Sequence, residues 1–66
     1  MFRNLEAEIV RQGMNNKSFA LSIGMKYLTF RKKILGITQF HLDEMNTIKK
    51  AFGDDLTLEY LFEQTE

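Results

Sequence analysis

The stretch from Asn16 to Leu35 reads NKSFALSIGMKYLTFRKKIL, and it decides the fold of this chain. Ala20 stands four residues before Gly24, and Phe30 stands six residues after it. Two helices that meet at a sharp angle need a small residue where they approach, a glycine at the turn and an apolar anchor on the second helix. The spacing therefore predicts two short helices that share a core formed by Phe19, Ile23, Met25, Phe30 and Ile34.

Apolar residues recur at helical spacing along the rest of the chain, and four glycines divide the sequence into short pieces. The recurring residues are Leu5, Ile9 and Val10, then Tyr27, Phe30 and Ile34, then Met45, Ile48 and Phe52. This periodicity is typical of amphipathic helices, and a glycine just past the last periodic residue is a common stop signal. Thr57 is suited to cap one further helix. We therefore predict a single all-α domain of five short helices over residues 1–66.

Charge is distributed unevenly along the sequence. The formal net charge is zero, yet residues 9–42 contain six basic side chains and no acidic one: Arg11, Lys17, Lys26, Arg31, Lys32 and Lys33. From residue 43 onward there are two lysines and seven acids, namely Asp43, Glu44, Asp54, Asp55, Glu59, Glu63 and Glu66. The basic run 31–33 has no acid three or four positions away, so ion pairs within its own helix do not account for it. Clustered Lys and Arg are typical of surfaces that bind the nucleic-acid backbone.

Several other classes of function are disfavoured. The sequence has no cysteine, which removes disulfides and thiolate metal sites, and the single His41 does not complete a zinc site. Ser18, Ser22 and His41 lack a third orienting group for nucleophilic catalysis. No stretch has the apolar length of a signal peptide or a membrane span. We therefore expect a soluble cytoplasmic protein that is not an enzyme, with no cofactor, metal or small-molecule substrate.

Across nearly its full length the sequence resembles the Cro and repressor helix-turn-helix family of phages and bacteria. The matching segments are NLEAEI at 4–9, Phe19-Ala20, Ile23-Gly24-Met25, Ile34-Leu35-Gly36, Phe40, Leu42-Asp43-Glu44 and LEYLF at 58–62. The resemblance implies a lambda-repressor-like domain in which the second and third helices form a helix-turn-helix and the third enters the DNA major groove. It also implies a sequence-specific transcriptional regulator of phage, prophage or bacterial origin, repressor or Cro-like, acting in the cytoplasm of a bacterial host cell. Such a protein binds a palindromic double-stranded operator as a homodimer.

The same resemblance assigns roles to individual residues. The base-reading positions are Tyr27, Leu28 and Lys32, with Arg31 beside them. Phosphate contacts are expected from Asn16, Lys17, Lys26, Thr29, Lys33, Gln39, Phe40 and His41, the last three through the backbone amides of their turn. Three places depart from the family pattern, and the first is Asn15-Asn16, where Ser, Thr or Gln is frequent around the first residue of the motif. Lys26 stands where a capping Ser or Thr is usual, which costs about 1 kcal/mol of helix stability, and a leucine at position 28 reads only a thymine methyl group.

Alternative interpretations stay open from the sequence. The basic run 31–33 is also compatible with a solvated helix face, and Tyr27 with a place in the domain's own core. An antirepressor-like protein-interaction module would keep the fold and use the acidic half of the chain. A basic amphipathic membrane binder fits poorly, because Phe30 and Ile34 are needed inside the fold. Candidates for a dimer surface, which would serve equally as core, are Leu56, Leu58, Tyr60 and Phe62.

Overall fold

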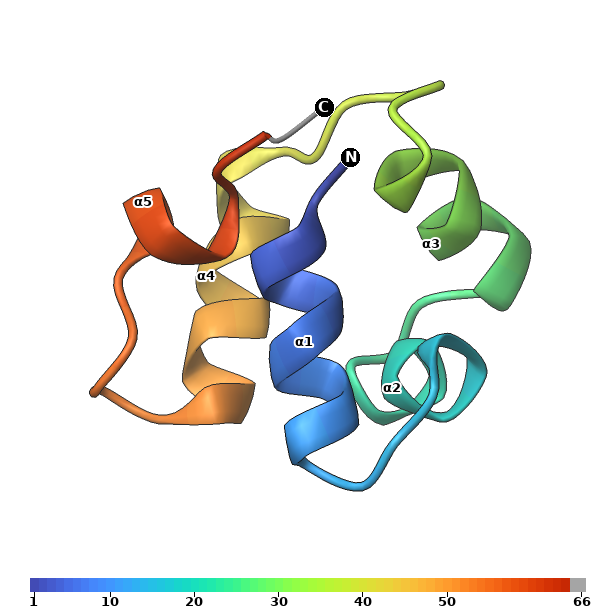
Figure 1. Ribbon diagram of the computed structural model, residues 1–66. Helices are drawn as coiled ribbons and strands as arrows, with labels where there is room; N and C mark the ends of the chain where they lie inside the picture. The colour runs from blue at the N-terminus through green and yellow to red at the C-terminus, as the bar shows by residue number, and fades with distance from the viewer. Residues whose placement is uncertain (65–66) are drawn as a thin grey trace.

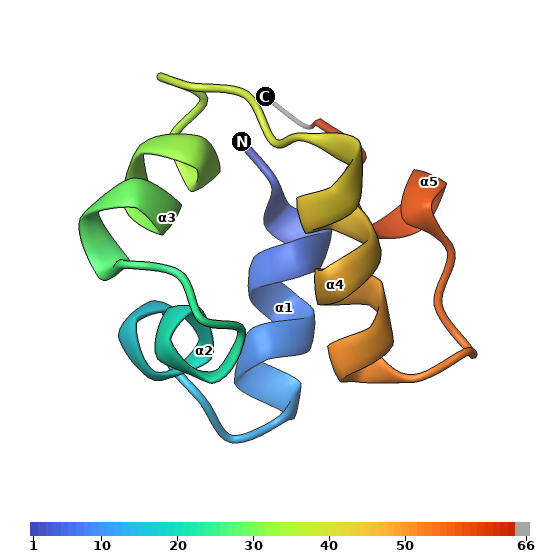
Figure 2. The same ribbon diagram turned by 180° about the vertical axis from the view of Figure 1, so that it is seen from behind.

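The computed structural model describes residues 1–64, which form five α-helices and contain no strand. The helices are α1 (Arg3–Arg11), α2 (Asn16–Ser22), α3 (Tyr27–Ile34), α4 (Leu42–Phe52) and α5 (Leu58–Leu61). α1 runs through the middle of the molecule, with α2 and α3 on one side of it and α4 and α5 on the other (Figures 1 and 2). The prediction of five short helices is confirmed, while Thr65 and the acidic Glu66 lie outside the described residues.

Glycine terminates the first four helices. Each of the four glycines follows a helix within two residues and has a positive φ. At Gly24, between α2 and α3, φ is 76°. The amides of Gly24 and Met25 donate to the carbonyls of Leu21 and Ala20 at 3.1 and 2.9 Å, which satisfies the last carbonyl groups of α2. The predicted stop signals are therefore confirmed, and α3 can start in a new direction immediately after the turn.

The six phenylalanines of the sequence form one connected series of ring contacts. Neighbouring ring centroids lie 5.1 to 6.0 Å apart, within the range that aromatic pairs prefer. In order of contact the rings are Phe52, Phe19, Phe30 and Phe40, with Phe2 and Phe62 both packed on Phe40. The series joins α2, α3, α4, the segment 35–41 and the residues flanking α1 and α5 into one core.

The inner face of α1 differs from the predicted one at a single position. Leu5 and Ile9 are fully buried as expected, but Val10 is 70% exposed. The prediction that Val10 shares the buried face is therefore wrong. Its place on that face is taken by Glu8, which is only 4% exposed despite its charge.

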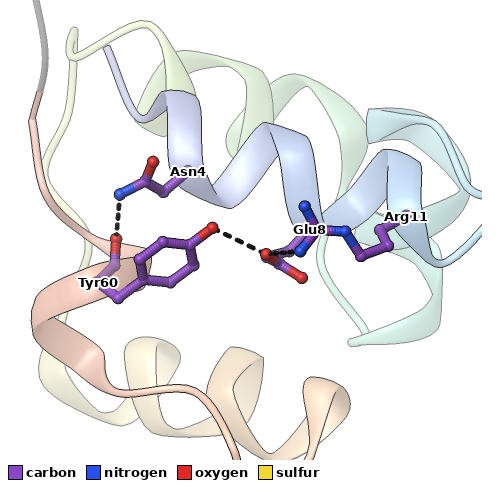
Figure 3. A network of polar contacts seen from close by, with 4 residues as sticks. All are labelled: Asn4, Glu8, Arg11 and Tyr60. Atoms are coloured by element: carbon purple, nitrogen blue, oxygen red, sulfur yellow. Dashed lines mark hydrogen bonds and ion pairs between the residues drawn. The ribbon is translucent and has the colours of Figure 1, made fainter.

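Glu8 is accommodated by a polar network that joins α1 to α5 (Figure 3). The Tyr60 hydroxyl donates to Glu8 Oε2 at 2.8 Å, and the Arg11 guanidinium forms an ion pair with the same oxygen. Asn4 Nδ2 donates to the carbonyl oxygen of Tyr60 at 2.9 Å. The hydrogen bond to Glu8 raises the pKa of Tyr60 above its ordinary value of 10.0, because it favours the protonated hydroxyl. These bonds fix α5, a helix of only four residues, against α1.

The side chains considered for a dimer surface belong largely to the interior. Leu56, Tyr60 and Phe62 are partly buried and pack against the core, and Leu58 is also partly buried. Tyr60 is further held by its hydrogen bond to Glu8. As predicted, Thr57 caps α5 by accepting a hydrogen bond from the Tyr60 amide at 3.1 Å.

Candidate nucleic-acid interface

α2 and α3 pack closely against each other at a steep angle. Residues 23–26 connect them, and the rings of Phe19 and Phe30 lie 5.7 Å apart between them. Figure 1 looks down the axis of α2 while α3 lies across the view. Ala20 is completely buried at this contact, where a larger side chain would separate the helices. The packing holds the inner side of α3 and leaves its outer side to solvent.

The start of α2 is fixed by a capping box that the sequence analysis missed. The N-cap residue is Asn15, whose Oδ1 accepts from the Ser18 amide at 2.8 Å, while the Asn15 amide donates to Ser18 Oγ at 3.0 Å. A capping residue followed three positions later by a second hydrogen-bonding side chain was the available signal. The box places Asn16, partly buried, and Lys17, exposed, in the first turn of the helix.

The outer side of α3 carries three of the four predicted base-reading residues in exposed positions. Leu28 is 67% exposed, and Arg31 and Lys32 are also exposed, whereas Tyr27 is partly buried. No ion-pair partner for Arg31 or Lys32 occurs within residues 1–64. This face therefore combines two cations that have no ion-pair partner in residues 1–64 with an exposed apolar side chain that does not pack into the core.

The first turn of α3 begins without a side-chain cap. Lys26 is the N-cap residue, and it makes no capping hydrogen bond, as the sequence predicts. The amides in the first turn of a helix lack partners within the helix, and they carry its positive end. Lys26 and Thr29, both exposed, flank this turn. The arrangement is suited to an anion.

Lys33 does not lie on this face, contrary to the prediction. Its side chain is only 7% exposed, and its Nζ donates to the Gln39 carbonyl at 2.9 Å and pairs with Glu44 Oε1 at 3.0 Å. The acidic partner comes from α4, so the rule of three or four residues within one helix could not find it. Lys33 connects the end of α3 to the segment that follows and is not available to a ligand.

Glu44 brings together three parts of the chain. Its Oε1 accepts from the His41 amide at 2.8 Å as well as pairing with Lys33. Burial alone would raise the pKa of Glu44, but the hydrogen bonds from His41 and Lys33 and the charge of Lys33 outweigh it, so the pKa is lowered from 4.5. The His41 amide, which the sequence analysis expects to contact phosphate, therefore already has a hydrogen-bond partner in Glu44.

Phe40 also has a structural role that the sequence analysis did not predict. Its ring is buried, with only 7% of the residue exposed, and it packs on Phe30 at a centroid distance of 6.0 Å. The residue therefore anchors the segment 35–41 to α3. Its backbone amide has no hydrogen-bond partner in the described part of the chain, so only that group, and not the side chain, is left for the contact expected from the sequence.

A hollow of about 600 Å³ lies between α3 and the start of α4. Its lining residues are Thr29, Lys32, Lys33, Thr38, Gln39 and His41. The structure thus brings together four of the predicted phosphate-contacting residues and adds Thr38, which sequence analysis did not identify. Asn16, Lys17 and Lys26 are not part of this hollow; they lie at the starts of α2 and α3.

Over residues 1–64, no three histidine, cysteine or acidic side chains are grouped so as to hold a metal ion. None of the helices in this range has the length and apolar character needed to cross a membrane. Comparison of the chain with known protein families, with curated proteins and with solved structures finds no match. The proposal for function therefore depends on the residues of this chain.

Proposed function

We propose that this protein binds double-stranded DNA in a sequence-specific manner and regulates transcription, with α3 as the recognition helix in the major groove. The observation that carries the proposal is the exposed face of α3, where Leu28, Arg31 and Lys32 point away from the core without partners in residues 1–64. Arg and Lys bind guanine O6 and N7, and an apolar side chain contacts the thymine methyl group. These three side chains supply both kinds of contact.

The packing of α2 on α3 supports a helix-turn-helix mode of binding. In this mode the second helix of the pair reads base edges and the first crosses the backbone. Lys17 in the first turn of α2 and Lys26 before α3 are exposed cations that would lie near phosphates. The uncapped start of α3 favours the same contact, because a phosphate oxygen would accept from its free amides.

The distribution of charge favours one orientation on DNA. Exposed acids in the described residues that follow α4 are Asp54, Asp55, Glu59 and Glu63. α4 and α5 lie on the opposite side of α1 from α2 and α3 (Figure 2). Polyanionic DNA is repelled by the side that holds α4 and α5 and attracted by the side that holds α2 and α3. Long-range electrostatics therefore direct α3 toward the DNA.

One copy of α3 reads only a few base pairs. The helix has eight residues, which corresponds to a length of about 12 Å. Proteins of this kind bind as dimers to two half-sites about 34 Å apart. Following the resemblance to Cro and repressor proteins, we propose a palindromic operator bound by a homodimer, in a regulator of phage, prophage or bacterial origin.

Selection of bound duplexes from a random-sequence pool tests this proposal. We expect enrichment of an inverted repeat whose half-sites are about 10 base pairs apart. The variant R31A/K32A should lose this enrichment, whereas K49A/K50A, which removes two lysines from α4, should keep it. The absence of any enriched sequence, or equal losses in both variants, would contradict the proposal. Weak binding without sequence preference would favour the protein-interaction module.

A further inference from the structure

The hollow beside α3 places the only histidine of the sequence next to two lysines. His41 contributes one wall, α3 contributes Thr29, Lys32 and Lys33, and Thr38 and Gln39 complete it. Lys33 is buried, whereas the other five residues are exposed. Two hydroxyl groups, an amide, the Lys32 ammonium and the His41 imidazole thus surround a space that opens to solvent, and such groups are typical donors to phosphate oxygens.

The charge of this hollow depends on one proton. Lys33 is paired with Glu44, whose lowered pKa keeps it ionised at neutral pH, so these two charges cancel. Lys32 has no ion-pair partner in residues 1–64 and contributes one positive charge. Histidine is the side chain that normally gains its charge between pH 8 and pH 5. Protonation of His41 therefore raises the net charge of the lining from one to two.

Charged groups on the elements around His41 set the electrostatic environment of its imidazole. Lys32 and Lys33 face the hollow from α3, and Thr38 and Gln39 of the connecting segment are uncharged. On its own helix, Glu44 binds the His41 backbone amide, and the exposed Asp43 is two residues away. A phosphate in the hollow would add a negative charge beside the imidazole and so attract its cationic form.

We infer that this hollow is a phosphate subsite of the proposed DNA interface, in which protonated His41 donates a charge-assisted hydrogen bond to a backbone oxygen. The inference rests on the proposed function and adds a proton to the binding reaction. DNA affinity then rises as the pH falls. Because each protomer takes up one proton, affinity changes by at most about tenfold per pH unit for each protomer bound.

Fluorescence anisotropy with a labelled selected duplex tests the inference. Affinity is measured at several salt concentrations near pH 6 and near pH 8, for the wild type and for His41→Gln, whose side chain does not titrate. His41→Asn serves as a second variant, since asparagine is a favoured N-cap. A matched control, H41Q/N46H, places a histidine at an exposed position of α4 outside the hollow. Circular dichroism checks that each variant folds.

We expect the wild type to bind on the order of tenfold more tightly near pH 6 than near pH 8. One additional neutralised phosphate also makes the slope of log K against log salt concentration steeper by about 0.9 for each protomer bound. His41→Gln and H41Q/N46H should show neither change. Equal pH dependence in the wild type and His41→Gln overturns the inference but leaves the proposed function standing. Failure of the wild type to bind duplex at either pH refutes the proposed function itself.

Discussion

Replacing Lys33 with methionine removes the ammonium group that joins α3 to the residues after it, while it keeps most of the aliphatic side chain. In the wild type this group donates to the Gln39 carbonyl at 2.9 Å and pairs with Glu44 at 3.0 Å. The Lys33→Met variant leaves that carbonyl without its donor and the carboxylate without its cation. Glu44 still accepts a hydrogen bond from the His41 amide.

The expected loss of stability follows from the exposure of the two partners. Breaking a fully buried ion pair costs about 3–5 kcal/mol, and an exposed pair contributes at most about 1 kcal/mol. The Lys33 side chain is 7% exposed, but Glu44 is 23% exposed, so water partly solvates the carboxylate left behind. We therefore expect the free energy of unfolding to fall by about 2 kcal/mol. For a domain of this size the melting temperature falls by roughly 8–16 °C.

Thermal unfolding at neutral pH, followed by circular dichroism, measures this loss. Lys32→Met is the matched control, because Lys32 is exposed and has no ion-pair partner in the described residues. Its free energy of unfolding should stay within about 0.5 kcal/mol of the wild type. The double variant K33M/E44Q should recover part of the loss, since glutamine needs no cation and still accepts from His41. Equal effects of Lys33→Met and Lys32→Met would refute the reasoning.

Four further predictions follow from the caps, titrating groups and exposed side chains of the structure. Lys26→Ser should stabilise the protein by about 1–2 kcal/mol, because serine supplies the cap that α3 lacks and the positive charge at the start of the helix is removed, yet it should weaken DNA binding. A loss of stability in thermal melts together with a loss of affinity in anisotropy would contradict this. The pKa of Glu44 is lowered by folding, so its contribution to stability is complete above about pH 4.5 and is lost as the pH falls through the pKa of the folded state. In urea unfolding, the free energy of unfolding should therefore decrease less at acid pH in Lys33→Met than in the wild type. The pKa of Tyr60 is raised, so its contribution to stability is present below pH 10.0 and is lost as the pH rises through the pKa of the folded state. An equal loss of stability at alkaline pH in Tyr60→Phe and in the wild type would contradict this account of the network. Leu28→Ala should lower affinity by about 1 kcal/mol for duplexes with a thymine at one position of each half-site and leave other duplexes unchanged, as measured by competition binding.

The elements that sequence analysis predicts correctly are those governed by local chemistry. Helical spacing of apolar residues and the conformational freedom of glycine act over a few residues. The position of Gly24 and the pairing of Phe19 with Phe30 are therefore readable in the printed sequence. The exposed outer face of α3 follows from the same periodicity, because Phe30 and Ile34 occupy the opposite side.

The features that sequence analysis misses depend on contacts between elements that are distant in the chain. Lys33 belongs to the interior because α4 supplies Glu44, and spacing within one helix contains no information about that partner. Glu8 replaces Val10 on the buried side of α1 because α5 supplies the Tyr60 hydroxyl. In both cases a charged side chain is buried where a second helix provides its hydrogen-bonding partner, which only the tertiary structure reveals.

Exposed cations on α2 and α3 are the groups that we propose bind double-stranded DNA. The most direct test is the dependence of duplex affinity on salt concentration, measured for the wild type and for K17A/K32A, with K49A/K50A as the control on α4. If the dimer makes about six phosphate contacts, affinity should fall on the order of a thousandfold between about 50 and 200 mM salt, and K17A/K32A should flatten the slope while the control keeps it. Weak binding that does not change with salt, or a slope that is the same in K17A/K32A and the wild type, would contradict the claim.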